Sequence, residues 1–172
     1  MKYPYYDMSV PVFITTLKSL KNVLAKGEAH AKSHEVKDEA LLNSRIIVDM
    51  FPLVKQVQIA CDNAKGAAGR LAQVEIPKMA DEEKTFAELY TRIDKTLKFL
   101  ESVKPEQFEK GAEIKAVFPY TPDKHILGKD YLPNYALPNF FFHITTAYNI
   151  LRGNGVTLGK TDYIGGVPFH DN

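Results

Sequence analysis

The chain contains one cysteine, no tryptophan and almost no net charge, because 22 Lys and Arg oppose 21 Asp and Glu among its 172 residues. A single cysteine excludes an internal disulfide framework, and we therefore expect a reducing, cytoplasmic location. A net charge of +1 gives no overall attraction to nucleic acid or to an anionic membrane. No apolar run approaches the roughly 20 residues that cross a bilayer, and the start of the chain lacks the features of a signal peptide. We expect neither nucleic acid nor a membrane as a partner.

Sequence motifs that would identify an enzyme class are also missing. The sequence has no glycine-rich dinucleotide or phosphate loop, no GxSxG nucleophile motif and no CxxC pair. Cys61 lies in an apolar helical pattern, which favours a small core residue over a nucleophile. Whether the protein is an enzyme therefore stays open at this point.

Hydrophobic residues recur at intervals of three and four in four segments, which predicts four amphipathic helices in one domain over residues 1–172. The expected helices cover residues 9–34, 39–72, 85–103 and 137–153. Pro52 falls inside the second of these helices and predicts a bend near residues 48–52.

The fold class expected from these segments is all-α, an antiparallel up-down-up-down four-helix bundle. A small β-hairpin or long loop is expected within residues 112–133, and an extended, packed segment is expected after residue 155. The expected core consists of large apolar residues from all four helices: Phe13, Leu17, Leu20, Ile47, Leu89, Ile93, Leu97, Phe140, Ile144 and Leu151.

The second expected helix carries a row of polar residues on an otherwise apolar segment. On a helix, Arg45, Asp49 and Gln56 fall on one side, and Arg45 and Asp49 have the i,i+4 spacing of an ion pair. The row is either a solvated face or the polar lining of an interior cleft. In the cleft interpretation, Arg45 and Asp49 pair inside the bundle and His143 faces them from the last helix.

Two further groups are candidates for a site. His143 lies at the edge of the apolar face of the last helix and suits either a structural hydrogen bond or a ligand role, and Tyr148 lies near the centre of that face. His30 and His34 have the i,i+4 spacing that places two imidazoles on one side of a helix.

The blocks LLNSRIIVDMFPLVKQVQIACDNAKGAAGRLA and NFFFHITTAYNILRGNGVTLGKTDYIG resemble a bacterial and fungal family of about 170 residues and unassigned function. That family is grouped with the DinB/YfiT-like four-helix bundles. The resemblance implies a homodimer and a divalent metal, such as Zn, Ni or Mn, held by three histidines. One of those histidines belongs to the second helix and two, spaced i,i+4, belong to the last. Characterised relatives include thiol-dependent transferases and isomerases.

The sequence departs from this metal pattern, because Ala147 follows His143 at i+4 and residues 39–72 contain no histidine. We therefore expect the metal ligands to be His143, Asp49 and His30. Asp49, His143 and Arg45 are the candidate catalytic residues, and Gln56 and Tyr148 the candidate cofactor-binding residues.

Two functions follow from these expectations. The first is a metal-dependent or acid–base enzyme acting on a small molecule in a cleft between helices two and four. The second is a non-catalytic dimeric protein, a small-molecule binder or a stress-response interaction protein, which has lost the metal site.

Overall fold

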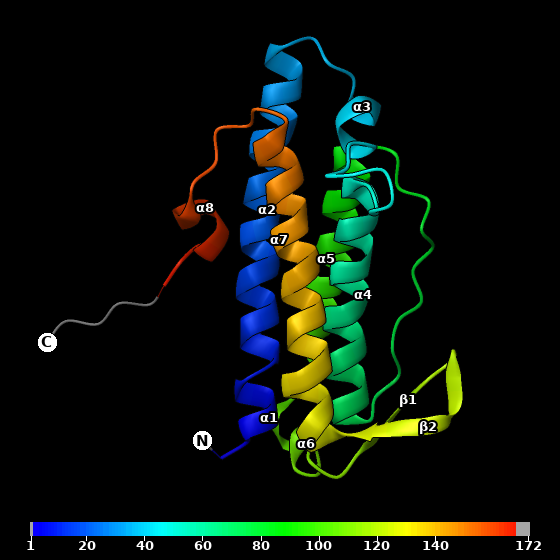
Figure 1. Cartoon of the computed structure of the whole chain (residues 1–172). Coiled ribbons are helices and arrows are strands. Elements are labelled where there is room, and N and C mark those ends of the chain that lie inside the picture. The colour runs from blue at the N-terminus through cyan, green and yellow to red at the C-terminus, as the bar shows by residue number, and fades with distance from the viewer. Residues whose placement is uncertain (1, 168–172) are drawn as a thin grey trace, which may run out of the picture.

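Four long helices packed side by side form the body of the molecule, shown by a computed structural model that describes residues 2–167 (Figure 1). They are α2 (Val10–Ser33), α4 (Leu53–Ala72), α5 (Phe86–Ser102) and α7 (Leu137–Gly153). Their positions confirm the predicted first, third and last helices. The third begins with a capping box in which Thr85 and Glu88 each satisfy a backbone N–H of the other.

The order of helix directions differs from the expected up-down-up-down order. The Phe13 ring contacts Phe140, and Gly27 lies against Leu151, so α2 and α7 run in the same direction. Helix α5 runs opposite to α2. The Tyr90 hydroxyl donates a hydrogen bond to Glu28 near one end of the two helices, and Lys18 pairs with Glu101 near the other end. Helix α4 runs down beside α5 and against α7 (Figure 1). The bundle is therefore up-down-down-up, and the predicted topology is wrong.

The length of the connection between α4 and α5 explains this order. Because the two helices are parallel, residues 73–85 must return along the whole bundle, as Figure 1 shows. A helix of 20 residues is about 30 Å long, and 13 extended residues reach about 40 Å. An antiparallel pair would need a loop of only about 2–8 residues. We call residues 73–85 the crossover.

The predicted helix over residues 39–72 is interrupted. Helix α3 (Asp38–Leu42) ends early, residues 43–52 form an irregular segment, and α4 begins at Leu53. Pro52 is the extended residue immediately before α4, where it sacrifices no helical hydrogen bond, whereas a proline inside the helix would cost about 3 kcal/mol. The branched side chains of Ile46, Ile47 and Val48 also weaken helix formation. Pro52 therefore marks the start of α4 and not the predicted bend within one long helix.

The core lies between the four helices and contains nine of the ten residues expected there. Ile47 is the exception, being 57% exposed in the irregular segment. Gly27 is buried in α2 and does not break the helix. A Cβ atom at this position would lie only 2.8 Å from the Leu151 side chain of α7. The glycine therefore allows α2 and α7 to approach closely.

The predicted hairpin is present as β1 (Lys115–Phe118) paired antiparallel with β2 (Thr121–Leu127). After Val156 and Leu158, both buried, the chain forms the short helix α8 (Lys160–Ile164), where an extended segment was expected. The part of that segment after residue 167 lies outside the described residues. The remaining elements are short: α1 (Pro4–Asp7), η1 (Pro105–Phe108), α6 (Gly128–Tyr131) and η2 (Leu132–Ala136). No helix within residues 2–167 combines the length and apolarity needed to span a membrane.

Candidate functional site

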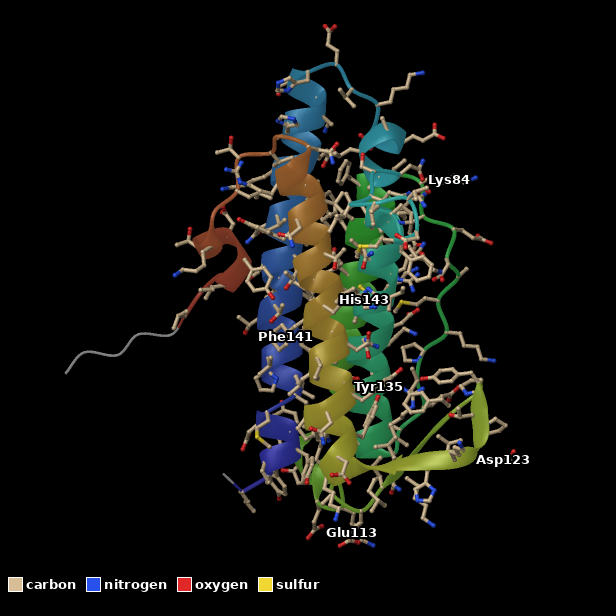
Figure 2. All side chains as sticks on the ribbon, in the orientation of Figure 1. Lys84, Glu113, Asp123, Tyr135, Phe141 and His143 are labelled. Carbon is tan, nitrogen blue, oxygen red and sulfur yellow. The ribbon has the colours of Figure 1, made fainter. Side chains whose placement is uncertain are left out.

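His143 and Gln56 are the two predicted site residues that the fold brings together. His143 of α7 lies midway along the bundle beside α4 (Figure 2), and its Nδ1 is 2.6 Å from Oε1 of Gln56. The Gln56 amide group donates its own hydrogen bond to the Phe51 carbonyl, over 2.9 Å. Because Oε1 of Gln56 must then be an acceptor, Nδ1 of His143 carries the proton. The pair therefore fixes the neutral tautomer with its hydrogen on Nδ1.

The surroundings of His143 favour its neutral form. Burial lowers the pKa of the imidazole below its ordinary value, because the charged form loses its hydration. The residue is 7% exposed, and its ring packs edge-on against Phe142, with 5.3 Å between ring centres. A neutral imidazole hydrogen-bonded to an amide is the arrangement expected of a structural histidine.

The predicted ion pair of Arg45 and Asp49 does not form, because both residues lie in the exposed segment 43–52 rather than on a helix. The Arg45 guanidinium instead donates to the carbonyl oxygens of Val48 and Met50, at 3.5 and 3.4 Å. No ion pair of Asp49 occurs in the part of the chain that the structure describes. The i,i+4 argument was wrong because it assumed a continuous helix.

His30 and Tyr148 also lie away from His143. His30 is in the last turns of α2, where its ring packs on His34 with centres 4.2 Å apart and it lines a small pocket with Asn154. Tyr148 is half-buried and packs against Tyr163 of α8. The predicted catalytic, cofactor and metal residues are therefore distributed over separate parts of the bundle.

The described residues do not fit the divalent metal site that the resemblance implies. Across residues 2–167, no group of three or more His, Cys, Asp or Glu side chains is arranged to hold a metal ion. His143 is bonded to an amide, whereas Asp49 lies in the exposed irregular segment and His30 packs on His34 near the end of α2. A single imidazole and an amide oxygen are a weak donor set for Zn, Ni or Mn.

The depressed pKa of His143 gives a testable pH dependence. As the pH falls below about 6.5, the unfolded state binds a proton before the folded state does, so the free energy of unfolding decreases. We expect a slope of up to about 1.4 kcal/mol per pH unit between pH 6.5 and 5 in urea unfolding. The variant His143→Asn should show a clearly flatter profile over this range. An unchanged slope would mean that His143 is not held neutral.

A network of charges around Arg92 is the largest polar cluster that sequence reasoning missed. Arg92 of α5 is 2% exposed. Its guanidinium contacts Asp62 of α4 at 2.8 Å and, in the crossover, Asp81 at 3.0 Å and Glu83 at 2.9 Å. It also donates to the Ala80 carbonyl, over 3.0 Å. The network thus fastens the crossover to both α4 and α5.

The acidic members of this network have further partners, so its charges balance. Lys55 pairs with Asp81, and Lys65 lies 3.0 Å from Asp62. Burial alone would raise the pKa of Asp81, but the hydrogen bond from Lys55 and the charge of Arg92 outweigh it and lower that pKa. Three cations therefore face three carboxylates. A sequence signal existed, because Arg92 lies directly beside the apolar stripe of Leu89 and Ile93.

Cys61 takes no part in a reactive site. It is fully buried, and loss of hydration raises the pKa of its thiol to about 12. The thiolate needed for nucleophilic attack is therefore not formed near neutral pH. This agrees with the prediction that Cys61 is a small core residue.

Comparisons with known proteins agree with the geometry of the bundle. Residues 5–164 match the model of the domain of unknown function DUF1993. The chain belongs to the DUF1993 family. A crystal structure of a DinB family member from Shewanella denitrificans is 44% identical and superposes with a TM-score of 0.93, covering 97% of this chain and 95% of that one. No curated protein matches the chain. The resemblance to DinB-like bundles is thus confirmed, and this DUF1993 protein is a DinB-family bundle of unknown function.

Proposed function

We propose that this DinB-family protein functions as a binding protein that forms a homodimer, and not through metal-dependent or acid–base chemistry. The observation that carries the proposal is the apolar segment 43–52, which the bundle leaves exposed. The lack of a ligand group of three or more within residues 2–167 supports it as well, because the enzyme interpretation placed His143, Asp49 and His30 around one cleft.

Four exposed apolar residues lie in the segment before α4, and a fifth lies on α7. We call them the apolar surface; its members are Ile46, Ile47, Val48, Phe51 and Phe142. Val48 is 84% exposed, and each of the others is more than half exposed. Phe142 is linked to the segment through two residues: its ring packs on His143, and the partner of His143, Gln56, donates a hydrogen bond to the Phe51 carbonyl. Single exposed apolar residues are ordinary, but a contiguous group is typical of an interaction surface.

A second copy of the chain is the partner that fits this surface best. The surface carries one cation, Arg45, and one anion, Asp49, and the two do not pair within the described chain. In a two-fold symmetric dimer, if one residue contacts a second residue of the other copy, the same contact occurs again with the two copies exchanged. Two reciprocal Arg45–Asp49 contacts around an apolar centre would then flank the interface, as charges commonly do at an interface rim.

Light scattering after size-exclusion chromatography tests the proposal. One chain has a mass of 19.4 kDa, so the dimer should have twice that mass. The variant Val48→Asp should be monomeric under the same conditions, because it places a carboxylate at the apolar centre. Val117→Asp makes the same change at an exposed position of β1 and should stay dimeric. A wild-type monomer at high concentration, or equal behaviour of the two variants, would refute the dimer.

A further inference from the structure

The crossover and α5 enclose a groove that is distinct from the apolar surface. Its volume is about 670 Å³, within the range of about 300–1,000 Å³ that is typical of small-molecule sites. One wall is the face of α5 that carries Thr91, Lys95 and Phe99, and the opposite wall is crossover residues 77–80. Figure 1 shows the crossover standing beside the bundle along most of its length.

Hydrogen bonds and ion pairs fix the crossover to α4 and to α5, so the groove is part of the fold. Near α4, the Val74 amide donates to the Gly69 carbonyl over 2.9 Å. Near α5, the buried Arg92 binds the Ala80 carbonyl and the carboxylate of Glu83. Between these anchors, residues 77–79 form the wall of the groove, and the Thr96 hydroxyl lies 3.9 Å from the sulfur of Met79. The wall is therefore supported by the fold and does not need a ligand to form.

The charges lining the groove are unequal once their partners are counted. Glu83 is occupied by Arg92 and Gln58, and Glu88 accepts hydrogen bonds from the backbone of Lys84 and Thr85. In contrast, the ion pairs formed within residues 2–167 leave out all three lysines of the lining, which are Lys78, Lys95 and Lys98, and one carboxylate, Glu82. With Arg92, four cations therefore line the groove against three carboxylates. Lys95 and Lys98 are neighbours on one helix face, where like charges repel. An anion between them would remove this repulsion.

Most of the remaining lining is apolar, and one member carries an unsatisfied donor. Pro77, Met79, Ala80 and Phe99 present carbon and sulfur surface to the groove. The Nε–H of Arg92 is buried without a hydrogen-bond partner among the described residues, and Arg92 lines the groove. A buried donor of this kind is rare and is stabilised by any acceptor that reaches it.

We propose that this groove binds an amphiphilic anion, a small molecule with an apolar body and a carboxylate or phosphate head. The apolar body lies on Met79 and Phe99, and the head is held by Lys95 and Lys98. The site does not depend on the dimer, because none of its residues belongs to the apolar surface.

Fluorescence titration with 1-anilinonaphthalene-8-sulfonate, an amphiphilic anion, tests the site directly. We expect saturable binding of one probe per chain, and displacement by decanoate or decyl phosphate. Decyltrimethylammonium has a matching apolar chain but a positive head, and it should displace the probe at least about tenfold less effectively. The relative strength of decanoate and decyl phosphate then shows which head the lysines prefer. Equal displacement by the cation would overturn the proposal, because the lysines would not be selecting the ligand.

Charge-reversal variants locate the binding. The double variant Lys95→Glu/Lys98→Glu should weaken probe binding about tenfold or more. The double variant Lys115→Glu/Lys129→Glu changes the net charge equally at exposed positions outside the groove and should bind as the wild type does. Val48→Asp should also retain binding, whether or not it dissociates a dimer. If Val48→Asp abolishes binding, or if the two double variants weaken it equally, the groove is not the site.

Discussion

Replacing Arg92 with methionine should lower the free energy of unfolding by about 3–5 kcal/mol, the usual cost of removing one partner from a buried ion pair. The Arg92 side chain is 1% exposed and lies against Asp62, Asp81 and Glu83. Methionine keeps the apolar stem but leaves Asp81 with Lys55, Asp62 with Lys65, and Glu83 with only the amide of Gln58. Glu83 suffers most, since its own side chain is 12% exposed. Urea unfolding followed by circular dichroism measures the loss.

Two further variants separate charge from packing in this result. Adding Glu83→Gln to Arg92→Met should recover part of the loss, because it removes the most buried unpaired carboxylate. Asp49→Ala removes a charge from the exposed segment and should change the free energy of unfolding by less than about 0.5 kcal/mol. All variants are compared in the Val48→Asp background, so that dimer formation does not contribute. If Arg92→Met is as stable as its background, the network does not anchor the crossover.

Replacing Phe140 with alanine should cost about 3–5 kcal/mol, because it removes a large ring from the core and leaves a cavity. Phe140 is fully buried and packs edge-on against Phe13, with 4.8 Å between ring centres. Ile47→Ala, at a position that the sequence pattern also assigned to the core, should cost less than about 0.5 kcal/mol in the Val48→Asp background. Similar losses at the two positions in urea unfolding would show that segment 43–52 is packed in solution.

The helices could be predicted from the sequence because each has a continuous apolar stripe and a local end signal. The stripe from Phe86 to Leu100 is preceded by Thr85, whose capping box fixes the start of α5. The directions of the helices could not be read from stripes, because a stripe is the same in either direction. The 13-residue crossover contained that information, since no antiparallel pair needs so long a connection.

The site was predicted less well because its residues were placed by angle on a helix that ends at Leu42. A polar row has meaning only while the 100° step continues, and the segment from Asn43 to Pro52 breaks that step. Gln56 and His143 lie beyond the break and do meet. The Arg92 network depends on Asp81 and Glu83 in the crossover, whose position follows from the topology and not from a local pattern.

The central claim is that this protein is a binding protein and does not act through a metal. The metal content of untagged protein, purified without chelator, tests this claim most directly. Elemental analysis should find well below one equivalent of Zn, Ni or Mn per chain, and EDTA should leave the melting temperature unchanged, because His143 has only an amide beside it. The variant His143→Asn should have the same metal content as the wild type. One equivalent of metal per chain in the wild type, lost in His143→Asn, would contradict the account.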